Sequence, residues 1–184
     1  MPISMHAISV PAYQQMLTSL SVVLGRAAEF AKKSGLDESE LMDRRFPPDM
    51  LTLAEQIRQA CVHSTLAVAR LAGITSPEIK MEPDKDIATA QSRIAATLRF
   101  FASVSADQME GDPDREVLVK TRLAELKYGA LDHLLHFANP QVFFHITTAY
   151  DLLRAEGVQI GKIDFMGQNM QDRVAAANQA ERAR

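Results

Sequence analysis

The sequence predicts an all-α protein folded as a four-helix bundle, and three observations lead to this prediction. Apolar residues recur every three or four positions through four long segments, which is the period of a helix that buries one face. Glycine and proline are scarce, with 8 of each in 184 residues, and they fall mainly between these segments. Four amphipathic helices bury their apolar stripes most simply against one another.

The first predicted bundle helix covers residues 10 to 34. Ser9 is its expected N-cap, Pro11 lies in its first turn, and Gly35 supplies the stop. Its apolar positions are Tyr13, Leu17, Leu20, Leu24, Ala27 and Ala31. A short helix is expected to follow from Asp37, which forms a capping-box pattern with Glu40, and to end before Pro47.

The second and third bundle helices have clear start signals. Thr52 and Glu55 form a capping-box pattern ahead of a stripe that runs to Gly73. Residues 74 to 85 are predicted to be a surface loop. Asp86 then caps a helix that we expect to fray near Ser105.

The remaining third of the chain is less regular. A β-hairpin is predicted from the β-branched run 116–121 and a returning arm 123–128. A brief helix over 130–138 should stop before a last bundle helix, for which Asn139 and Pro140 are the expected N-cap and first residue and Gly157 the end. Residues 158–167 are expected to be a loop. The domain therefore spans 1–167, and the Ala/Arg-rich segment 168–184 is expected to be a loose or partner-dependent helix rather than part of the core.

Composition excludes several classes of function. The net charge is −3 and the pI about 5.9, so the chain lacks the positive field that binds nucleic acid. No apolar run exceeds four residues, so no membrane span is expected, and residues 1–6 lack the features of a signal peptide. The lone cysteine, Cys61, indicates a reducing compartment, and we expect a cytoplasmic protein.

Two histidines are the candidate site residues of the bundle. His145 lies about 60° from Val142 on the last helix, at the edge of its apolar stripe. Gln141 comes one turn earlier and Thr148 follows, and both are candidate ligand-binding residues together with His145 and His63. One interpretation is that His145 and His63 face one cavity and hold a divalent cation, Zn or Ni, with water completing the shell. The other is that His145 is a structural histidine and His63 lies on the surface.

Other reactive residues have simpler explanations. His133 and His136, three residues apart beside Asp132, could clip a cation, but an exposed polar face is the more common arrangement. Cys61 is in the apolar register of its helix, which predicts a buried hydrophobe rather than a nucleophile. The segment between Gly157 and Gly167 lacks the lysine and Ser/Thr of a phosphate-binding loop.

Several strings together resemble a bacterial family of unknown function in the DinB-like superfamily. They are Ser4-Met5-His6-Ala7-Ile8-Ser9-Val10-Pro11, Pro48-Asp49-Met50-Leu51-Thr52-Leu53 with Gln56 and Ala60-Cys61, Ala69-Arg70-Leu71-Ala72-Gly73, the run 139–154 (NPQVFFHITTAYDLLR), and Gly157-Val158, Gly161-Lys162 and Asp164-Phe165-Met166-Gly167. The resemblance covers residues 1 to 167. It implies a DinB/YfiT-type up-down-down-up bundle, with the hairpin inserted before the last helix, and a homodimer.

The resemblance also bears on the site. Better-known relatives carry three metal-binding histidines, one on the second helix and two spaced by four on the last. His145 matches one of the last-helix positions and His63 approximately matches the second-helix position, whereas Gln141 stands where the other histidine would be. We therefore expect a homodimeric module that binds a small ligand or a protein, without a complete metal site. The alternative is a metal-dependent transferase or hydrolase of the thiol-transferase type that uses His145 and His63. A third possibility is a scaffold protein that binds a partner helix through its tail.

Overall fold

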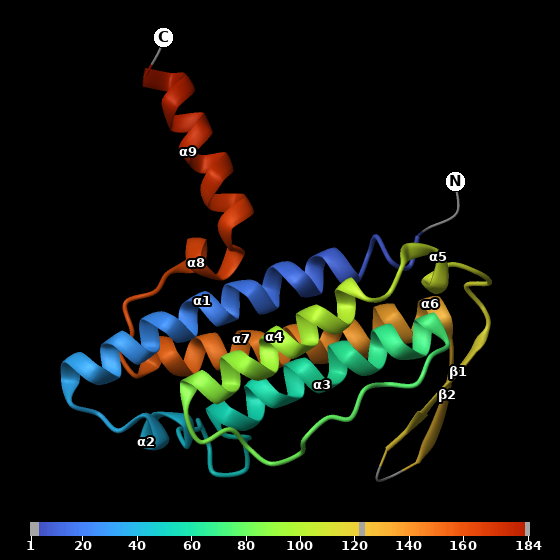
Figure 1. The fold of residues 1–184 in the computed structure, drawn as a ribbon, viewed down its shortest axis with the longest axis horizontal. Helices are drawn as coiled ribbons and strands as arrows, with labels where there is room; N and C mark the ends of the chain where they lie inside the picture. Colours follow the sequence, from blue (N-terminus) through green and yellow to red (C-terminus); the bar gives the residue numbers. More distant parts are fainter. Residues whose placement is uncertain (1–3, 122–123, 183–184) are drawn as a thin grey trace.

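The fold was analysed in a computed structural model, which describes residues 4–121 and 124–182. Four long helices form the bundle: α1 (Val10–Ser34), α3 (Leu53–Ala72), α4 (Ile87–Ala102) and α7 (Asn139–Ala155). Around the bundle α1 packs on α4, α4 on α3, α3 on α7, and α7 on α1. Figure 1 shows that α3 and α4 run in the same direction, opposite to α1 and α7. The predicted up-down-down-up bundle is therefore confirmed.

Helix α1 has the predicted bounds and the predicted buried stripe. Its end at Gly35 is also as expected, because this glycine takes the left-handed conformation with φ of 69°. The prediction that Ser9 caps the helix is wrong. The Ser9 hydroxyl donates to the Met5 carbonyl oxygen at 2.6 Å, because residues before the helix already form a turn and place that carbonyl within reach.

Helices α2 (Glu38–Met42) and α3 follow the sequence signals closely. Asp37 caps α2 by accepting from the Ser39 amide at 2.8 Å, rather than through the capping box with Glu40. Thr52 and Glu55 form the predicted capping box of α3, and Gly73 ends that helix with φ of 65°.

A long connection, residues 73–86, which we call the strap, joins α3 to α4. Asp86 caps α4 by accepting from the Thr89 amide at 2.7 Å, as predicted. Instead of fraying near Ser105, the chain ends α4 at Ala102 and starts a second short helix, α5 (Ala106–Met109). Ser105 and Gln108 form the capping box of α5.

The predicted hairpin is present as β1 (Glu116–Lys120) and β2 (Glu125–Gly129), an antiparallel pair in which Val117 faces Tyr128. The start of the predicted returning arm, residue 123, lies outside the described residues. Val117 and Val119 are buried, whereas the alternate residues of β1 are exposed, so one face of the hairpin packs on the bundle.

The expected break before the last helix does not occur. Helix α6 (Ala130–His133), a π-helical turn η1 (Leu134–Ala138) and α7 form one continuous helical segment. Asn139 has helical dihedral angles and accepts a hydrogen bond from the Tyr13 hydroxyl at 2.6 Å, so it is not an N-cap. Proline lacks an amide hydrogen. The wide turn immediately before Pro140 explains how the helix passes through it.

The segment after α7 was expected to be a loop but contains a short helix, α8 (Lys162–Met166). The tail forms α9 (Gln168–Arg182), which has no buried residue and projects from the bundle (Figure 1). This agrees with the expectation that the tail is not part of the core. Within the described ranges, no helix is long and apolar enough to cross a membrane.

Candidate functional site

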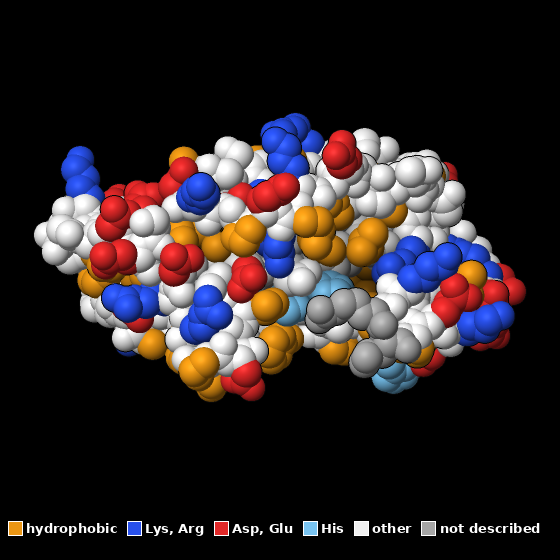
Figure 2. Space-filling view, turned by 90° about the horizontal axis from the view of Figure 1, so that it is seen from below, with side chains coloured by type: hydrophobic (Ala, Val, Ile, Leu, Met, Phe, Trp, Pro, Cys, Tyr) orange, Lys and Arg blue, Asp and Glu red, His pale blue; other side chains and the backbone are white. Residues whose placement is uncertain are grey.

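Helix α3 presents a row of polar residues to α7. Gln56, His63 and Arg70 are seven residues apart, so they lie on one face of the helix, about two turns from one another. The two helices pack closely along this face. Figure 2 shows histidine side chains that reach the molecular surface among hydrophobic side chains. We call this surface the histidine face. It consists of Gln56, His63 and Arg70 of α3 and, opposite them, His133 of α6, Phe137 of η1, and Phe144 and His145 of α7.

His63 and His145 form a stacked pair at the centre of the histidine face. Their ring centroids are 5.3 Å apart and the rings are within 9° of parallel. Each ring also has an aromatic neighbour: Phe137 packs edge-on against His63, and Phe144 packs edge-on against His145. The two rings therefore lie together, as the sequence interpretation of a shared site requires, and His63 is half-buried rather than fully exposed.

Gln56 determines the tautomer of the neutral His145 ring, that is, which ring nitrogen carries the hydrogen. Its side-chain oxygen lies 2.7 Å from His145 Nδ1, and its side-chain amide donates to the Leu51 carbonyl oxygen at 3.4 Å, which fixes the orientation of the amide. Because an amide oxygen only accepts, His145 Nδ1 must carry the hydrogen and donate it. In the neutral ring, Nε2 then keeps its lone pair for another partner.

Burial keeps the pair uncharged. Loss of water around the ring lowers the pKa of His145 to about 4, and the neighbouring His63 adds to this. The pKa of His63 is also lowered to about 4, first by burial and then by the positive charge of Arg70. At neutral pH both rings are therefore neutral, and they can accept hydrogen bonds or coordinate a cation.

Arg70 supplies the positive charge of this face. The guanidinium is about half buried, and this partial loss of water lowers its pKa. Within the described part of the chain it makes no hydrogen bond and no ion pair, although an arginine has five N–H donors. A partly desolvated charge without a protein partner is uncommon, because burial of a charge is costly unless it is paired.

His133 closes one end of the histidine face. It is fully buried, stacked on Phe137 and edge-on to Tyr128. Neither ring nitrogen has a hydrogen-bond partner, and burial lowers its pKa to about 4. The predicted exposed face is therefore wrong for His133, because the hairpin places Tyr128 over its ring. It is correct for His136, which is exposed and lies 2.6 Å from Asp132.

A family model described as "Domain of unknown function (DUF1993)" matches residues 5–166. The chain belongs to this family. A crystal structure of a DinB family member protein from Shewanella denitrificans is similar to the chain, with 27% sequence identity and a TM-score of 0.79. The similarity covers 89% of this chain and 92% of the other. No curated protein matches the sequence.

These findings confirm that the DUF1993 chain has a DinB-like fold, as the sequence resemblance implied. The other two candidate ligand-binding residues, Gln141 and Thr148, make no hydrogen bond to the histidine pair within the described residues. The Thr148 hydroxyl donates to the Phe144 carbonyl oxygen at 2.8 Å, within its own helix. Gln141 is half-buried.

Gln56 and Arg70 belong to the site but were not predicted to. Both stand in the strings that suggested the family, and both are seven residues from His63. That spacing is the signal that could have identified them, because a heptad separation places residues on one helical face.

The donor set does not fit the three-histidine metal site of better-known DinB relatives. His63 and His145 provide two imidazoles, but Gln141 occupies the position of the third. The amide oxygen that approaches the pair, from Gln56, already accepts from His145 Nδ1. Among the described residues, no cluster of three His, Cys, Asp or Glu side chains could hold a metal ion.

Proposed function

We propose that this DUF1993 protein is a small-ligand-binding module, and that its ligand is a small organic anion bound at the histidine face. The observation that carries the proposal is the unpartnered Arg70 guanidinium, half buried two turns from the stacked histidines. A planar guanidinium matches the geometry of a carboxylate or phosphate and binds it with two hydrogen bonds. The protein provides no such partner within the described residues.

The neutral histidines would complete the recognition of this ligand. His145 Nε2 can accept a hydrogen bond from an O–H or N–H group, because Gln56 holds the hydrogen on Nδ1. The apolar walls, Phe137 and Phe144, suit a flat or aliphatic ligand body. The supported class is therefore a small carboxylate or phosphate ester that also carries a hydrogen-bond donor.

The test uses sodium benzoate as the probe, since it combines a carboxylate with a planar apolar body. Titration of the full chain should produce saturable shifts of the His63 and His145 ring resonances in long-range proton–nitrogen NMR spectra. Arg70→Gln should weaken binding about tenfold or more, because a charge-assisted hydrogen bond contributes about 1.5–3 kcal/mol.

The matched control is Arg99→Gln, which removes the same charge from an exposed position on α4. This variant should bind benzoate like the parent protein. The proposal fails if benzoate causes no saturable shift at about 10 mM, or if both arginine variants weaken binding equally, since that would indicate only a general charge effect.

A second candidate is a metal-dependent transferase or hydrolase that binds a divalent cation through His63 and His145. The tautomer supports it, because metal-binding histidines usually donate their other ring hydrogen to an oxygen, as His145 does to Gln56. Elemental analysis after dialysis against Zn²⁺ or Ni²⁺ tests it. This candidate loses its support if each chain retains less than about a tenth of an equivalent of metal and His145→Ala does not change that metal content.

We further infer that the protein is a homodimer. Phe143 and Phe144 on α7 are 36% and 54% exposed, and such large side chains usually lie in interfaces when they are adjacent on a surface. A second copy that covers Phe144 would also shield the neighbouring His145 ring. Sedimentation velocity should show a dimer that Phe144→Ser dissociates, whereas a monomeric parent protein would contradict this inference.

A further inference from the structure

The opposite side of α3 forms a cavity that is separate from the histidine face. It has a volume of about 390 Å³ and lies between α3, α4 and the strap. Cys61 and Thr65 of α3 line it, with Thr97 and Phe100 of α4. Cys61 and His63 are two residues apart, so their side chains point about 160° apart around the helix. A ligand in this cavity would not touch the histidine pair.

The direction of the chain explains why a cavity forms here. Because α3 and α4 are parallel, the strap must return along the length of α3, about 30 Å for its 20 residues. Residues 73–86 can span about 46 Å when extended, so most of their reach is used in crossing. The strap therefore roofs the α3–α4 groove with extended backbone instead of filling it with a helix.

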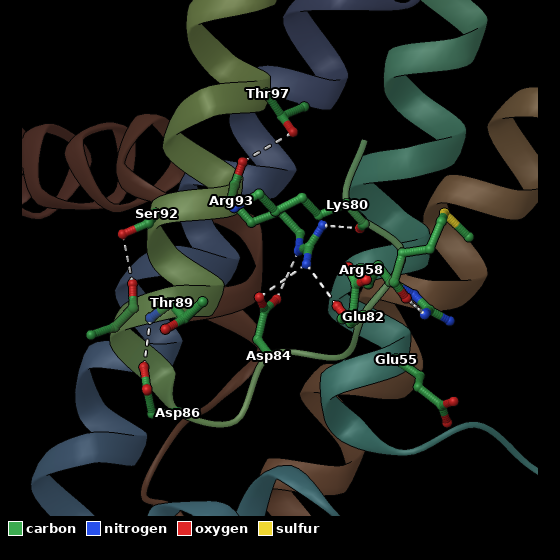
Figure 3. A network of polar contacts seen from close by, with 12 residues as sticks. Glu55, Arg58, Lys80, Glu82, Asp84, Asp86, Thr89, Ser92, Arg93 and Thr97 are labelled. Atoms are coloured by element: carbon green, nitrogen blue, oxygen red, sulfur yellow. Dashed lines mark hydrogen bonds and ion pairs between the residues drawn. The ribbon is translucent and has the colours of Figure 1, made fainter. Parts of the chain in front are cut away.

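The strap is held firmly over this groove. The Arg93 guanidinium donates to both carboxylate oxygens of Asp84, at 2.8 and 3.0 Å, and to the carbonyl oxygens of Lys80 and Glu82 at 2.7 and 3.0 Å (Figure 3). Arg58 of α3 donates to the Met81 carbonyl oxygen. The cavity is thus preformed, and the charge of Arg93 is already neutralised by Asp84.

The polar groups on the cavity floor are satisfied, with one exception. The Thr97 hydroxyl donates to the Arg93 carbonyl oxygen at 3.1 Å, and the Cys61 thiol contacts the Thr97 side chain. Thr65 is only 3% exposed as a residue, and within the described residues its hydroxyl has no hydrogen-bond partner. Because this hydroxyl is not one of the fully buried unpaired atoms and Thr65 lines the cavity, it opens into that space. The adjacent Ser64 bonds to the carbonyl oxygen one turn earlier, at 2.8 Å, as buried helical hydroxyls usually do.

We infer that this cavity binds a small neutral molecule with an apolar body and one hydrogen-bonding group, which pairs with the Thr65 hydroxyl. The cavity is within the size range of small-molecule sites, and such sites combine apolar walls with few polar groups. A neutral ligand is favoured because the charged residues that line the cavity balance: Arg93 is paired with Asp84, and Glu78 and Lys80 carry opposite charges. The ring of Phe100 suits an aromatic body, so a phenol is the simplest member of this class.

The probe for this site is 4-fluorophenol, which has one ring and one hydroxyl. Fluorine NMR of the probe should show saturable binding to the full chain, and the amide resonances that shift should be those of residues 61–65, 93–100 and the strap. Thr65→Val removes only the hydroxyl and should weaken binding about fivefold to tenfold. Ala96→Phe, at an exposed position beside the cavity, should fill the site and abolish binding.

The matched control is Thr147→Val, an exposed threonine on α7 outside the cavity, which should leave binding unchanged. Circular dichroism melts establish that each variant is folded. The inference is overturned if 4-fluorophenol shifts no cavity resonance at about 10 mM, or if it shifts the histidine face instead. It is also overturned if Thr65→Val binds as tightly as Thr147→Val, since the hydroxyl would then have no ligand to recognise.

Discussion

The polar groups buried on the two sides of α3 differ in how completely they are hydrogen-bonded. On the side of α4, the strap satisfies Arg93 with a carboxylate and two carbonyl oxygens, and Asp84 is 3% exposed in its side chain. On the side of α7, both ring nitrogens of the buried His133 lack partners among the described residues, and the half-buried Arg70 makes no hydrogen bond to those residues. The α4 side of α3 thus adjoins a hydrogen-bonded ion pair between α4 and the strap, although Arg58 Nε of α3 is buried there without a partner in the described part of the chain. The α7 side adjoins the His133 ring, of which neither nitrogen is paired within the described residues.

This difference separates structural polar groups from candidate binding groups. A buried pair with complete hydrogen bonding holds elements together, and it needs no further molecule. Groups that remain unpaired reduce stability and persist where a ligand completes them or where they serve a mechanism. The histidine face therefore contains the groups best suited to binding, whereas the Arg93–Asp84 pair fixes the strap.

The largest expected effect is a loss of stability in mild acid, which originates on the histidine face. The pKa values of His63, His133 and His145 are lowered to about 4, from about 6.5 in the unfolded chain. Between these values the unfolded state binds more protons, so the free energy of unfolding falls as the pH drops. From pH 6.5 to 5, urea denaturation should show a loss of about 1.5 kcal/mol for each histidine.

His133→Phe is the control for this prediction. It keeps a ring between Tyr128 and Phe137 and removes two unsatisfied nitrogens, so the variant should be about 1 kcal/mol more stable at pH 7. Between pH 6.5 and 5 this variant should lose about one third less free energy of unfolding than the parent protein, because one of the three histidines is gone. A parent protein with constant stability between pH 6.5 and 5 would show that these rings are not buried as neutral groups.

The next largest effect concerns the other face. Asp84→Ala should lower the free energy of unfolding by about 3 kcal/mol, because it leaves the Arg93 guanidinium nearly buried without its carboxylate. The double variant Asp84→Ala with Arg93→Met removes both charges and should recover part of this loss. Chemical denaturation of the three proteins measures both changes.

An exposed ion pair provides the comparison for Asp84. Glu29 and Lys33 on α1 are 4.0 Å apart, and both side chains are largely exposed. Glu29→Ala should change stability by less than about 0.5 kcal/mol. If Asp84→Ala were equally mild, the strap would not depend on this pair, and a preformed cavity beneath it would lose its main support.

The sequence predicted the bundle well because its helices carry local signals. The signals that held each act within one turn of their helix and need no distant partner: the Thr52–Glu55 capping box, the Asp86 cap, and the glycines at 35 and 73. The break at Asn139 and Pro140 failed because its outcome depends on a distant residue. Asn139 has helical dihedral angles because the helix continues through it from η1, and its side-chain oxygen accepts from Tyr13 of α1 instead of capping.

The site was predicted only in part, for the same reason. His63 and His145 were paired from their place on two helices, and the structure joins them. The burial of His133 depends on Tyr128 from the hairpin, and the role of Gln56 depends on a residue 89 positions away. Neither contact leaves a periodic trace in the sequence, although the heptad spacing of Gln56, His63 and Arg70 was visible.

The smallest expected effect is that of removing the tail, residues 168–184. Helix α9 packs on α8 and has no buried residue, so its loss uncovers almost no apolar surface. The truncated protein should unfold at the same urea concentration as the parent, within error, and benzoate and 4-fluorophenol should bind equally well. Sedimentation velocity gives the informative result: an unchanged oligomeric state would exclude the tail from self-association, whereas dissociation would support the scaffold alternative and place the interface on α9 rather than on Phe144.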